Sequence, residues 1–298
     1  MKDIVVGGKV IGKKYGAIKI LGTVGDNVKF NIGSPCVVFD GKLYHMWCGS
    51  DVGRNKRIHY YTSIDGKVWT EFGTVLSIGD INSFDNYNIC NPSVIFDGTT
   101  YHMWYNGFDG STYKLHYATS EDGKVWNKHG VIINLGADIH RYHVTSQSII
   151  YDGNMYKMWY NIYDGFKRKY TMCYTTSIDG MLWDKYKLVT LLENNDINDK
   201  YQQHSPSVIF NGTIFIMLYV VSDDIHSSIH YATSEDGVVW NKHGVLIPLG
   251  DDGDTDSYNI DAPFIIEDNG KYKVWYTGYD GIEERLHYAE LLESSLIK

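Results

Sequence analysis

One short phrase recurs five times along this chain, at spacings of 55 to 59 residues. It begins with an aromatic residue, passes through a small residue and a Pro, and ends in an apolar run with an Asp-Gly or Asn-Gly turn. The copies begin at Phe30, Tyr87, Tyr142, Tyr201 and Tyr258, and the Pro stands at Pro35, Pro92, Pro206 and Pro263, with Gln147 in the third copy. Units of about 40–60 residues with several short strands are typical of a β-propeller.

Each unit can be divided into four strands. In the second unit, the segments 93–96, 100–105, 114–118 and 131–133 are rich in β-branched and aromatic residues and are separated by Gly-containing turns. No stretch of the chain keeps a helical period of apolar residues. The sequence therefore predicts an all-β, five-bladed propeller with four antiparallel strands in each blade.

The fifth unit lacks its fourth strand, and a matching segment stands at the other end of the chain. Residues 14–22 (KYGAIKILG) resemble residues 242–250 (KHGVLIPLG). An open ring would leave unpaired strand edges, which promote aggregation. We therefore expect the N-terminal strand to close the last blade. We predict a single domain over 1–298, with blades at about 29–79, 84–136, 139–192, 198–250 and 256–291 and the closing strand at 14–22.

Composition and charge exclude some classes of function. The chain has 298 residues, 43% of them hydrophobic, and a net charge of −9 with no cluster of Lys and Arg, so we expect no nucleic-acid partner. The first 14 residues contain no long apolar run, so we expect neither a signal peptide nor a membrane span. The predicted location is the cytoplasm, or a particle assembled there. Four cysteines without a CxxC pair are expected to be free thiols: Cys36, Cys48, Cys90 and Cys173.

The tryptophans follow the repeat, which predicts that they pack between blades rather than bind sugar. Four occupy one position of the second strand, and four follow the Asp-Gly turn before the fourth strand: Trp47, Trp104, Trp159 and Trp275, then Trp69, Trp126, Trp183 and Trp240. Four histidines hold another repeat position and are predicted to be structural as well: His59, His116, His230 and His287.

Strand direction predicts which face carries function. The short, repetitive turns between first and second strands and between third and fourth strands share one face. The opposite face carries the long, divergent connections 77–90, 134–145, 193–204 and 248–261, where function on a repeat scaffold usually lies. The candidate ligand-binding residues at this mouth of the central channel are Asn31, Asn88, Asn91, His143, Gln202, His204, Asn259 and Asp261. Their amides, imidazoles and carboxylate suit sugar hydroxyls.

These phrases resemble those of the five-bladed glycosidase propellers. The segments 91–98 (NPSVIFDG), 101–107 (YHMWYNG) and 118–126 (ATSEDGKVW) carry the resemblance, and similar phrases recur over most of residues 29–290. The chain resembles glycoside hydrolase families 43, 32 and 68 and the related family 130 mannoside phosphorylases. The resemblance implies a propeller that acts on carbohydrate through carboxylates at the starts of innermost strands, as Asp-Pro in two blades and Glu-(Gly/Ala/Cys)-Pro in another.

The carboxylates that the resemblance implies are not at the matching positions. The residues directly before the Pro position are neutral in all five units: Ser34, Asn91, Ser146, Ser205 and Ala262. One residue earlier, only Asp261 carries a carboxylate, and glycoside hydrolysis needs two. Asp85, Asp199 and Asp256 precede the repeat aromatic by two residues, where turn capping is the expected role and a catalytic role the alternative. Residues 251–256 (DDGDTD) form either a solvated acidic loop or a Ca²⁺ loop; no other cofactor is predicted.

Three classes of function stay open. The favoured hypothesis is a non-catalytic or weakly catalytic, glycan-recognising propeller with its site at the axial mouth. The second is an active glycoside hydrolase or phosphorylase that uses Asp261 with a loop Asp. The third is a structural, decoration or adhesion subunit of a larger assembly, a viral particle included, with protein partners in that assembly.

Overall fold

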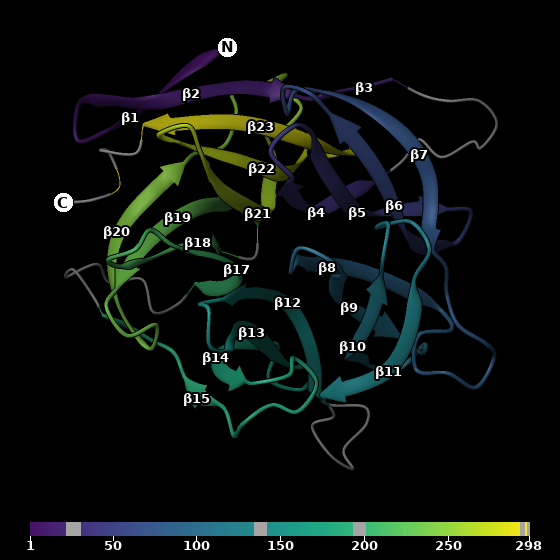
Figure 1. Ribbon diagram of the computed structural model, residues 1–298. Helices are drawn as coiled ribbons and strands as arrows, with labels where there is room; N and C mark the ends of the chain where they lie inside the picture. Colours follow the sequence, from purple (N-terminus) through teal and green to yellow (C-terminus); the bar gives the residue numbers. More distant parts are fainter. Residues whose placement is uncertain (22–30, 134–141, 193–200, 224, 293–295, 297–298) are drawn as a thin grey trace.

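The chain folds into five β-sheets arranged around a central axis (Figure 1). The computed structural model describes all residues except 22–30, 134–141, 193–200, 224, 293–295 and 297–298. Every described element is a strand, and in each blade the first three strands follow one another outward in chain order. The prediction of an all-β, five-bladed propeller is confirmed.

The first strand of each blade lies at the axis. Blade 1 contains β4 (Ile32–Phe39), β5 (Tyr44–Val52), β6 (Asn55–Ser63) and β7 (Val68–Leu76). Blade 2 contains β8 (Asn88–Phe96), β9 (Tyr101–Phe108), β10 (Tyr113–Ser120) and β11 (Asn127–Ile133). Blade 3 contains β12 (Tyr142–Tyr151), β13 (Tyr156–Asp164), β14 (Lys169–Ser177) and β15 (Lys187–Leu188).

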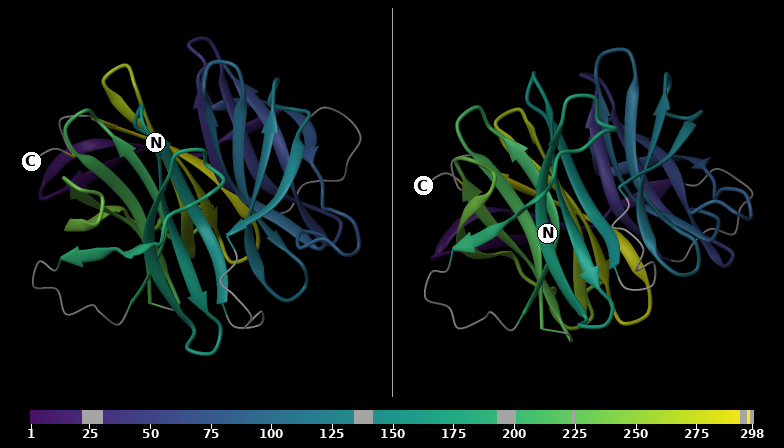
Figure 2. Two further views of the ribbon diagram at one scale, coloured as in Figure 1. Left: turned by 60° about the horizontal axis from the view of Figure 1, so that its bottom comes forward. Right: turned by 90° about the horizontal axis from the view of Figure 1, so that it is seen from below.

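Blades 4 and 5 complete the ring. Blade 4 contains β17 (Gln202–Phe210), β18 (Phe215–Ser222), β19 (Ser227–Ser234) and β20 (Val239–Ile247). Blade 5 contains β21 (Asn259–Asp268), β22 (Lys271–Tyr279) and β23 (Glu284–Leu292), followed at its outer side by β2 (Lys9–Ala17). Seen from the side, the hairpins of the blades collect at two opposite ends of the axis (Figure 2).

The N-terminal strand closes the last blade, as predicted, but its bounds differ from the predicted 14–22: the closing strand is β2 (Lys9–Ala17), and residues 19–21 pair with blade 1 instead. β2 pairs antiparallel with β23, with Lys14 opposite Ala289 and Ala17 opposite His287. The structure adds three strands that the repeat does not contain. β1 (Lys2–Val6) pairs with the outer edge of β2, whereas β3 (Lys19–Leu21) and β16 (Thr190–Leu192) pair in parallel with β7 and β20. Because β2 and β3 follow one another, the N-terminal segment joins blades 5 and 1.

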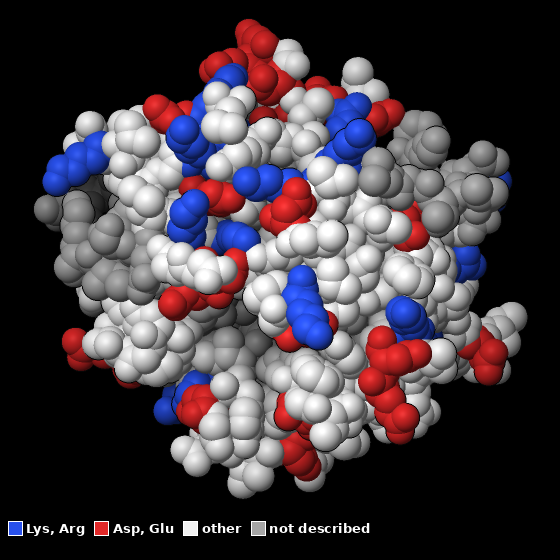
Figure 3. Space-filling view, turned by 45° about the horizontal axis from the view of Figure 1, so that its top comes forward, with Lys and Arg blue, Asp and Glu red and all other residues white. Residues whose placement is uncertain are grey.

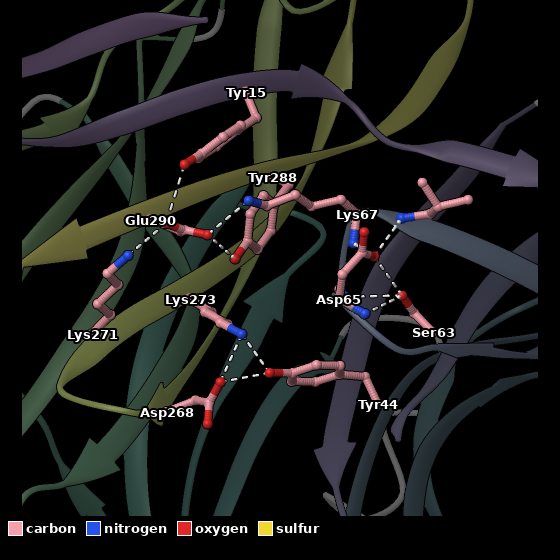
Figure 4. A network of polar contacts seen from close by, with 12 residues as sticks. Tyr15, Tyr44, Ser63, Asp65, Lys67, Asp268, Lys271, Lys273, Tyr288 and Glu290 are labelled. Carbon is pink, nitrogen blue, oxygen red and sulfur yellow. Dashed lines mark hydrogen bonds and ion pairs between the residues drawn. The ribbon is translucent and has the colours of Figure 1, made fainter. Parts of the chain in front are cut away.

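Polar contacts reinforce the junction of blades 5 and 1 (Figure 4). Glu290 on β23 accepts a hydrogen bond from Tyr15 at 3.1 Å and pairs with Lys67 of blade 1 at 3.0 Å. Tyr44 of blade 1 donates a hydrogen bond to Asp268 of blade 5 at 2.5 Å. Lysine and phenol donors hold the pKa of Glu290 down at about 2 although burial acts in the opposite direction.

The tryptophans of the second strands connect neighbouring blades, which confirms their predicted packing role. Each indole N–H donates to the carbonyl oxygen of the Gly in the next blade's Asp-Gly turn, and its ring meets the next blade's Trp edge to face. The four bonds are Trp47 to Gly123 (2.8 Å), Trp104 to Gly180 (2.8 Å), Trp159 to Gly237 (2.7 Å) and Trp275 to Gly66 (2.8 Å). The ring centroids are 6.1–6.4 Å apart.

The junction of blades 4 and 5 is built differently. Leu218 stands where the other blades carry Trp, and the closing strand β2 follows Gly7-Gly8 rather than a Ser-x-Asp-Gly turn. Aliphatic side chains from both blades and from the N-terminal hairpin form one buried cluster there, which includes Leu218, Ile265 and Ile4. The ring thus has four tryptophan junctions and one aliphatic junction.

Two aspartates that had an alternative catalytic interpretation are structural. Asp85 and Asp256 are buried, and each carboxylate pairs with a lysine of the outer strand, Lys128 at 2.6 Å and Lys14 at 2.7 Å. They therefore do not supply carboxylates to the axial mouth. Asp199, at the same repeat position, lies outside the described residues. Within the described part of the chain, no helix is long and apolar enough to cross a membrane.

Candidate axial site

The innermost strand of every blade bulges where it reaches the axis. The residue before the Pro position has a positive φ: Ser34 (55°), Asn91 (49°), Ser146 (53°), Ser205 (52°) and Ala262 (46°). Each of these residues sits inside a register shift of the first strand against the second. Non-glycine residues in this region are sterically disfavoured, so the surrounding structure has to hold them.

Side chains of the preceding blade hold three of the five bulges. The amide of Ser146 donates to Asn106 Oδ1 at 3.1 Å, and that of Ser205 donates to Asn161 Oδ1 at 3.0 Å. The amide of Ser34 donates to Thr277 Oγ1 at 3.0 Å. These contacts fix the first strands around the axis and shape the floor of the cavity above them.

A cavity of about 300 Å³ opens at the axis above the bulges, and residues from all five blades line it. Its charged and aromatic side chains are Lys56, Tyr113, Tyr170, His204, Asp261 and Glu284. A second cavity of about 350 Å³ lies between blades 4 and 5 and shares His204, Asp261, Thr277 and Glu284 with the first. The mouth of the channel therefore has two lobes with one common wall.

The residues predicted to bind ligand divide into two groups. Asn88, Asn91, His204 and Asp261 line the axial cavity, and Asn259 lines the second one together with His204 and Asp261. Asn31, His143 and Gln202 are not among the described residues that line either cavity. The structure thus brings five of the eight predicted residues to the mouth, and their role in binding stays a prediction.

Five of the predicted ligand-binding residues occupy the same repeat position, one in each blade, and each has a structural hydrogen-bond partner. Each side chain accepts a hydrogen bond from the start of the third strand of the preceding blade. The bonds are Lys56 N to Asn88 (2.7 Å), Tyr113 N to His143 (3.2 Å), Tyr170 N to Gln202 (3.1 Å), Ser227 Oγ to Asn259 (3.2 Å) and Glu284 N to Asn31 (3.4 Å). This joint between blades explains why all five residues are hydrogen-bond acceptors without invoking a ligand.

Asp261 has a structural contact of its own. Its Oδ1 accepts the amide N–H of Ala262 at 2.5 Å, and its side chain is 51% exposed. The preceding blade offers Val220 where others offer Asn106, Asn161 or Thr277, so Asp261 takes the place of the missing acceptor. About half of the side chain stays exposed, and Asp261 lines both cavities.

His204 lies beside Asp261. Its Nδ1 is 3.6 Å from Asp261 Oδ1 and 3.0 Å from Ser205 Oγ, and its ring lies 4.8 Å from that of Tyr170. Burial, together with the Asp261 charge, raises the pKa of Tyr170 to about 12, which keeps the phenol protonated. The wall of the cavity therefore combines a carboxylate, an imidazole and a neutral phenol.

Glu284 is a carboxylate of the mouth that the sequence reasoning missed. It begins β23, and its Oε2 lies 3.5 Å from Lys56 Nζ across the junction of blades 5 and 1. Burial lowers the pKa of Lys56, but Glu284 and other nearby groups outweigh it, so the pKa is raised overall. Carboxylates were sought at the starts of first strands and in the connections that precede them, and Glu284 lies in neither place. The acidic hairpin at Glu283 and Glu284, on the predicted functional face, was the available signal.

The acidic loop 251–256 holds lysines of the N-terminal hairpin. Lys2 Nζ lies 2.6 Å from Asp251 and 2.5 Å from Asp254, while Lys14 pairs with Asp256. On the face that carries the N-terminal edge, Lys and Arg side chains alternate with Asp and Glu (Figure 3). No group of three or more His, Cys, Asp or Glu in the described part of the chain is arranged to hold a metal ion.

A larger cavity than these two, about 540 Å³, lies on the side of blade 4, where Tyr201, Lys242 and Pro248 line it. The equivalent spaces of blades 2 and 5 contain Asp85 and Asp256. In blade 4 the preceding residues 193–200 lie outside the described part of the chain, so no site is assigned to this cavity.

Solved structures with the same fold include several proteins named for carbohydrates. An N-acetylgalactosamine deacetylase from F. plautii, in complex with blood group B trisaccharide, is 20% identical with a TM-score of 0.75, and the match covers 94% of this chain and 95% of that chain. A β-1,2-mannobiose phosphorylase from Listeria innocua is 10% identical with a TM-score of 0.74, covering 93% and 94%. A thermostable family-43 glycoside hydrolase is 17% identical with a TM-score of 0.71, covering 90% and 91%.

These neighbours confirm the resemblance at the level of the fold, which is that of glycoside-hydrolase-like five-bladed propellers. No protein-family model matches the chain. An uncharacterised protein of Mycobacterium tuberculosis is 35% identical over 108 residues, a match that covers 34% of this chain and 35% of that protein. The chain thus matches about a third of the length of its curated relatives.

Proposed function

We propose that this propeller binds a glycan at the axial mouth. The observation that carries the proposal is the cavity of about 300 Å³ in which the five blades converge. It presents two carboxylates, an imidazole, an ammonium, amides and two phenols within one concave surface. Hydroxyl-rich ligands need closely spaced donors and acceptors of this kind, with aromatic rings against the sugar faces.

The charges of the cavity favour a glycan without acidic groups. Lys56 contributes +1, and Asp261 and Glu284 contribute −2, so these three residues of the lining sum to −1. Lys56 is already paired with Glu284. A uronate or sulfate group would meet uncompensated carboxylate charge, whereas hydroxyls can donate to it.

A glycan array followed by calorimetry on the purified protein tests this proposal. Asp261→Ala and His204→Ala should each weaken binding of a hit by roughly tenfold or more, because a ligand group is left unpaired in the cavity. Glu235→Ala, an exposed carboxylate in a turn of the opposite face, is the matched control and should bind as the wild type does. Binding that survives both mouth variants undiminished would move the site elsewhere, and no binding at all would favour the assembly-subunit hypothesis.

Glycoside hydrolysis is a second candidate function, and one observation favours it. Asp261 and Glu284 line both cavities, so two carboxylates face the same space, as acid-base hydrolysis of a glycosidic bond needs. Release of reducing sugar from arabinan, xylan, fructan or mannosides tests it. Turnover that disappears in both Asp261→Asn and Glu284→Gln would establish it, and binding without turnover would leave the chain a recognition module.

A further inference from the structure

A serine hydroxyl and an imidazole lie within hydrogen-bonding distance at the floor of the axial cavity. Ser205 Oγ is 3.0 Å from Nδ1 of His204, and both residues line the cavity. Blade 4 is the one blade whose bulge serine follows a histidine. The corresponding preceding residues in the other blades are Gly33, Cys90, Thr145 and Asp261.

We propose that Ser205 and His204 form the nucleophile and base of a serine-type acyl hydrolase whose substrate is a small carboxylic ester, such as an acetyl ester. A serine becomes a nucleophile when an adjacent base can take its proton, and a third group commonly orients that base. The distance between Ser205 Oγ and His204 Nδ1 meets the geometric requirement of about 2.6–3.2 Å. The activity is independent of whether the ester is carried by a glycan.

The backbone holds Ser205 in a fixed position. Its φ is 52°, its amide is bound by Asn161 Oδ1 at 3.0 Å, and little of the residue is exposed. Ser34 has the same backbone conformation, with φ 55° and its amide bound by Thr277. Strain is therefore a property of the scaffold, and the chemical difference at Ser205 is the neighbouring imidazole.

The imidazole is also held in place. The ring of His204 packs against Tyr170 with an interplanar angle of 34°, and its side chain is largely buried. Asp261 Oδ1 lies 3.6 Å from Nδ1, close enough to stabilise the imidazolium that forms when the proton moves. Asp261 is a positioning residue in this scheme, because it acts through His204.

The reaction balances with water as the second substrate. Ser205 Oγ attacks the ester carbonyl carbon while its proton passes to His204 Nδ1. The tetrahedral intermediate collapses, the C–O bond to the alcohol breaks, and the alcohol takes the proton from His204, leaving an acyl ester on Ser205. A water molecule gives its proton to His204 and attacks the acyl carbon, so carboxylic acid leaves and Ser205 recovers its proton. Lys56 and Tyr113 in the same cavity carry the N–H and O–H groups that a developing oxyanion needs.

Hydrolysis of p-nitrophenyl acetate and labelling by a fluorophosphonate, followed by mass spectrometry of the peptide that contains Ser205, test the proposal on the full chain. Wild type and Ser34→Ala should hydrolyse the ester and carry the label on Ser205. Ser205→Ala and His204→Gln should each lose about 100-fold or more of the rate. The double variant should be no slower than either single one, because the two residues act as a unit.

A rate in Ser205→Ala within threefold of the wild type, or a label on a different residue, would overturn the proposal, as would absence of both hydrolysis and label in the wild type. Melting curves establish that each variant is folded. If Ser205→Ala does not fold, His204→Gln decides, because it keeps the serine and removes only the base. The probes contain no sugar, so this test stands whether or not the protein binds a glycan.

Discussion

At the scale of single residues, the positive-φ residue in the bulge of each first strand explains much of the structure of the mouth. In three blades the amide of this residue donates to a side chain of the preceding blade, Asn106, Asn161 or Thr277. Blade 4 has Val220 at that place, and Asp261 accepts the amide of Ala262 instead. Asp261, which the sequence analysis considered as a catalytic carboxylate, thus also has a local structural role.

Asp261→Ala should destabilise the protein by about 1 kcal/mol, because the Ala262 amide loses its acceptor at a site that water can partly reach. Asp261→Asn, which keeps an oxygen at the same position, should be close to neutral. Urea unfolding of the three proteins measures the difference. Equal midpoints for wild type and Asp261→Ala would show that the carboxylate has no such role.

A second prediction at this scale concerns the tryptophan bonds. Gly123 O accepts from both Trp47 and Trp126, whereas Trp183 Nε1 is buried without a partner and Gly180 O accepts from Trp104. Trp104→Phe should therefore leave a buried carbonyl unpaired and cost about 1–3 kcal/mol. Trp47→Phe keeps one donor at Gly123 and should cost less. Chemical denaturation of both variants checks the order, and the reverse order would contradict this account.

At the scale of elements, the N-terminal hairpin of β1 and β2 completes blade 5 and closes the ring. β2 covers the edge of β23, Tyr15 binds Glu290, and Lys2 and Lys14 form ion pairs with aspartates of the loop 251–256. The hairpin therefore combines strand pairing with ion pairs that reach blade 4's connection to blade 5. Its partners come from the far end of the chain, so blade 5 can be completed only when both ends are present.

Deleting residues 1–22 should expose the edge of β23 and cause aggregation or a large loss of thermal stability. Deleting residues 1–8 removes β1 but leaves most of β2, so the effect should be much smaller. Light scattering and melting curves compare the two truncations. A monomeric 1–22 deletion with an unchanged melting curve would disprove the importance of closure.

The elements differ in how far the sequence could predict them. The blades were predictable because Pro, Trp and Asp-Gly recur at fixed spacing, and β2 because it copies a repeat strand. β1, β3 and β16 were not, because their pairing depends on where the chain ends and connections happen to lie. Glu284 was missed for a different reason. It begins the third strand of blade 5, and the other blades carry Lys56, Tyr113, Tyr170 and Ser227 at this repeat position, so the repeat itself does not mark a carboxylate there.

At the scale of the whole molecule, buried histidines make stability depend on pH. Burial lowers the pKa of His116 and of His287 from 6.5 to about 4, against the attraction of Asp85 and Asp256. Both are neutral in the folded protein near pH 5, while the unfolded chain protonates them below about 6.5. The unfolded state then binds more protons, so stability falls as the pH drops from 6.5 towards 4.

The melting temperature should therefore decrease over this pH range, with each histidine contributing at most about 1.4 kcal/mol per pH unit. The double variant His116→Gln/His287→Gln should have a flatter profile between pH 6.5 and 4.5. Below that range, loss of the Glu290 carboxylate, whose pKa is held at about 2, should weaken both proteins alike. Parallel profiles for the wild type and the double variant above pH 4.5 would contradict the assignment.

The aliphatic junction between blades 4 and 5 gives the ring an uneven response to temperature. Ser207 and Ser227 form hydrogen bonds across this junction, but it lacks the indole hydrogen bond of the other four junctions, and apolar contact around Leu218 and Ile265 takes its place. Apolar association weakens on cooling, and hydrogen bonds do so much less. On cooling, the junction of blades 4 and 5, which lies beside His204 and Asp261, should therefore open before the other four junctions. Low temperature should thus loosen this wall of the cavity before it loosens the tryptophan junctions.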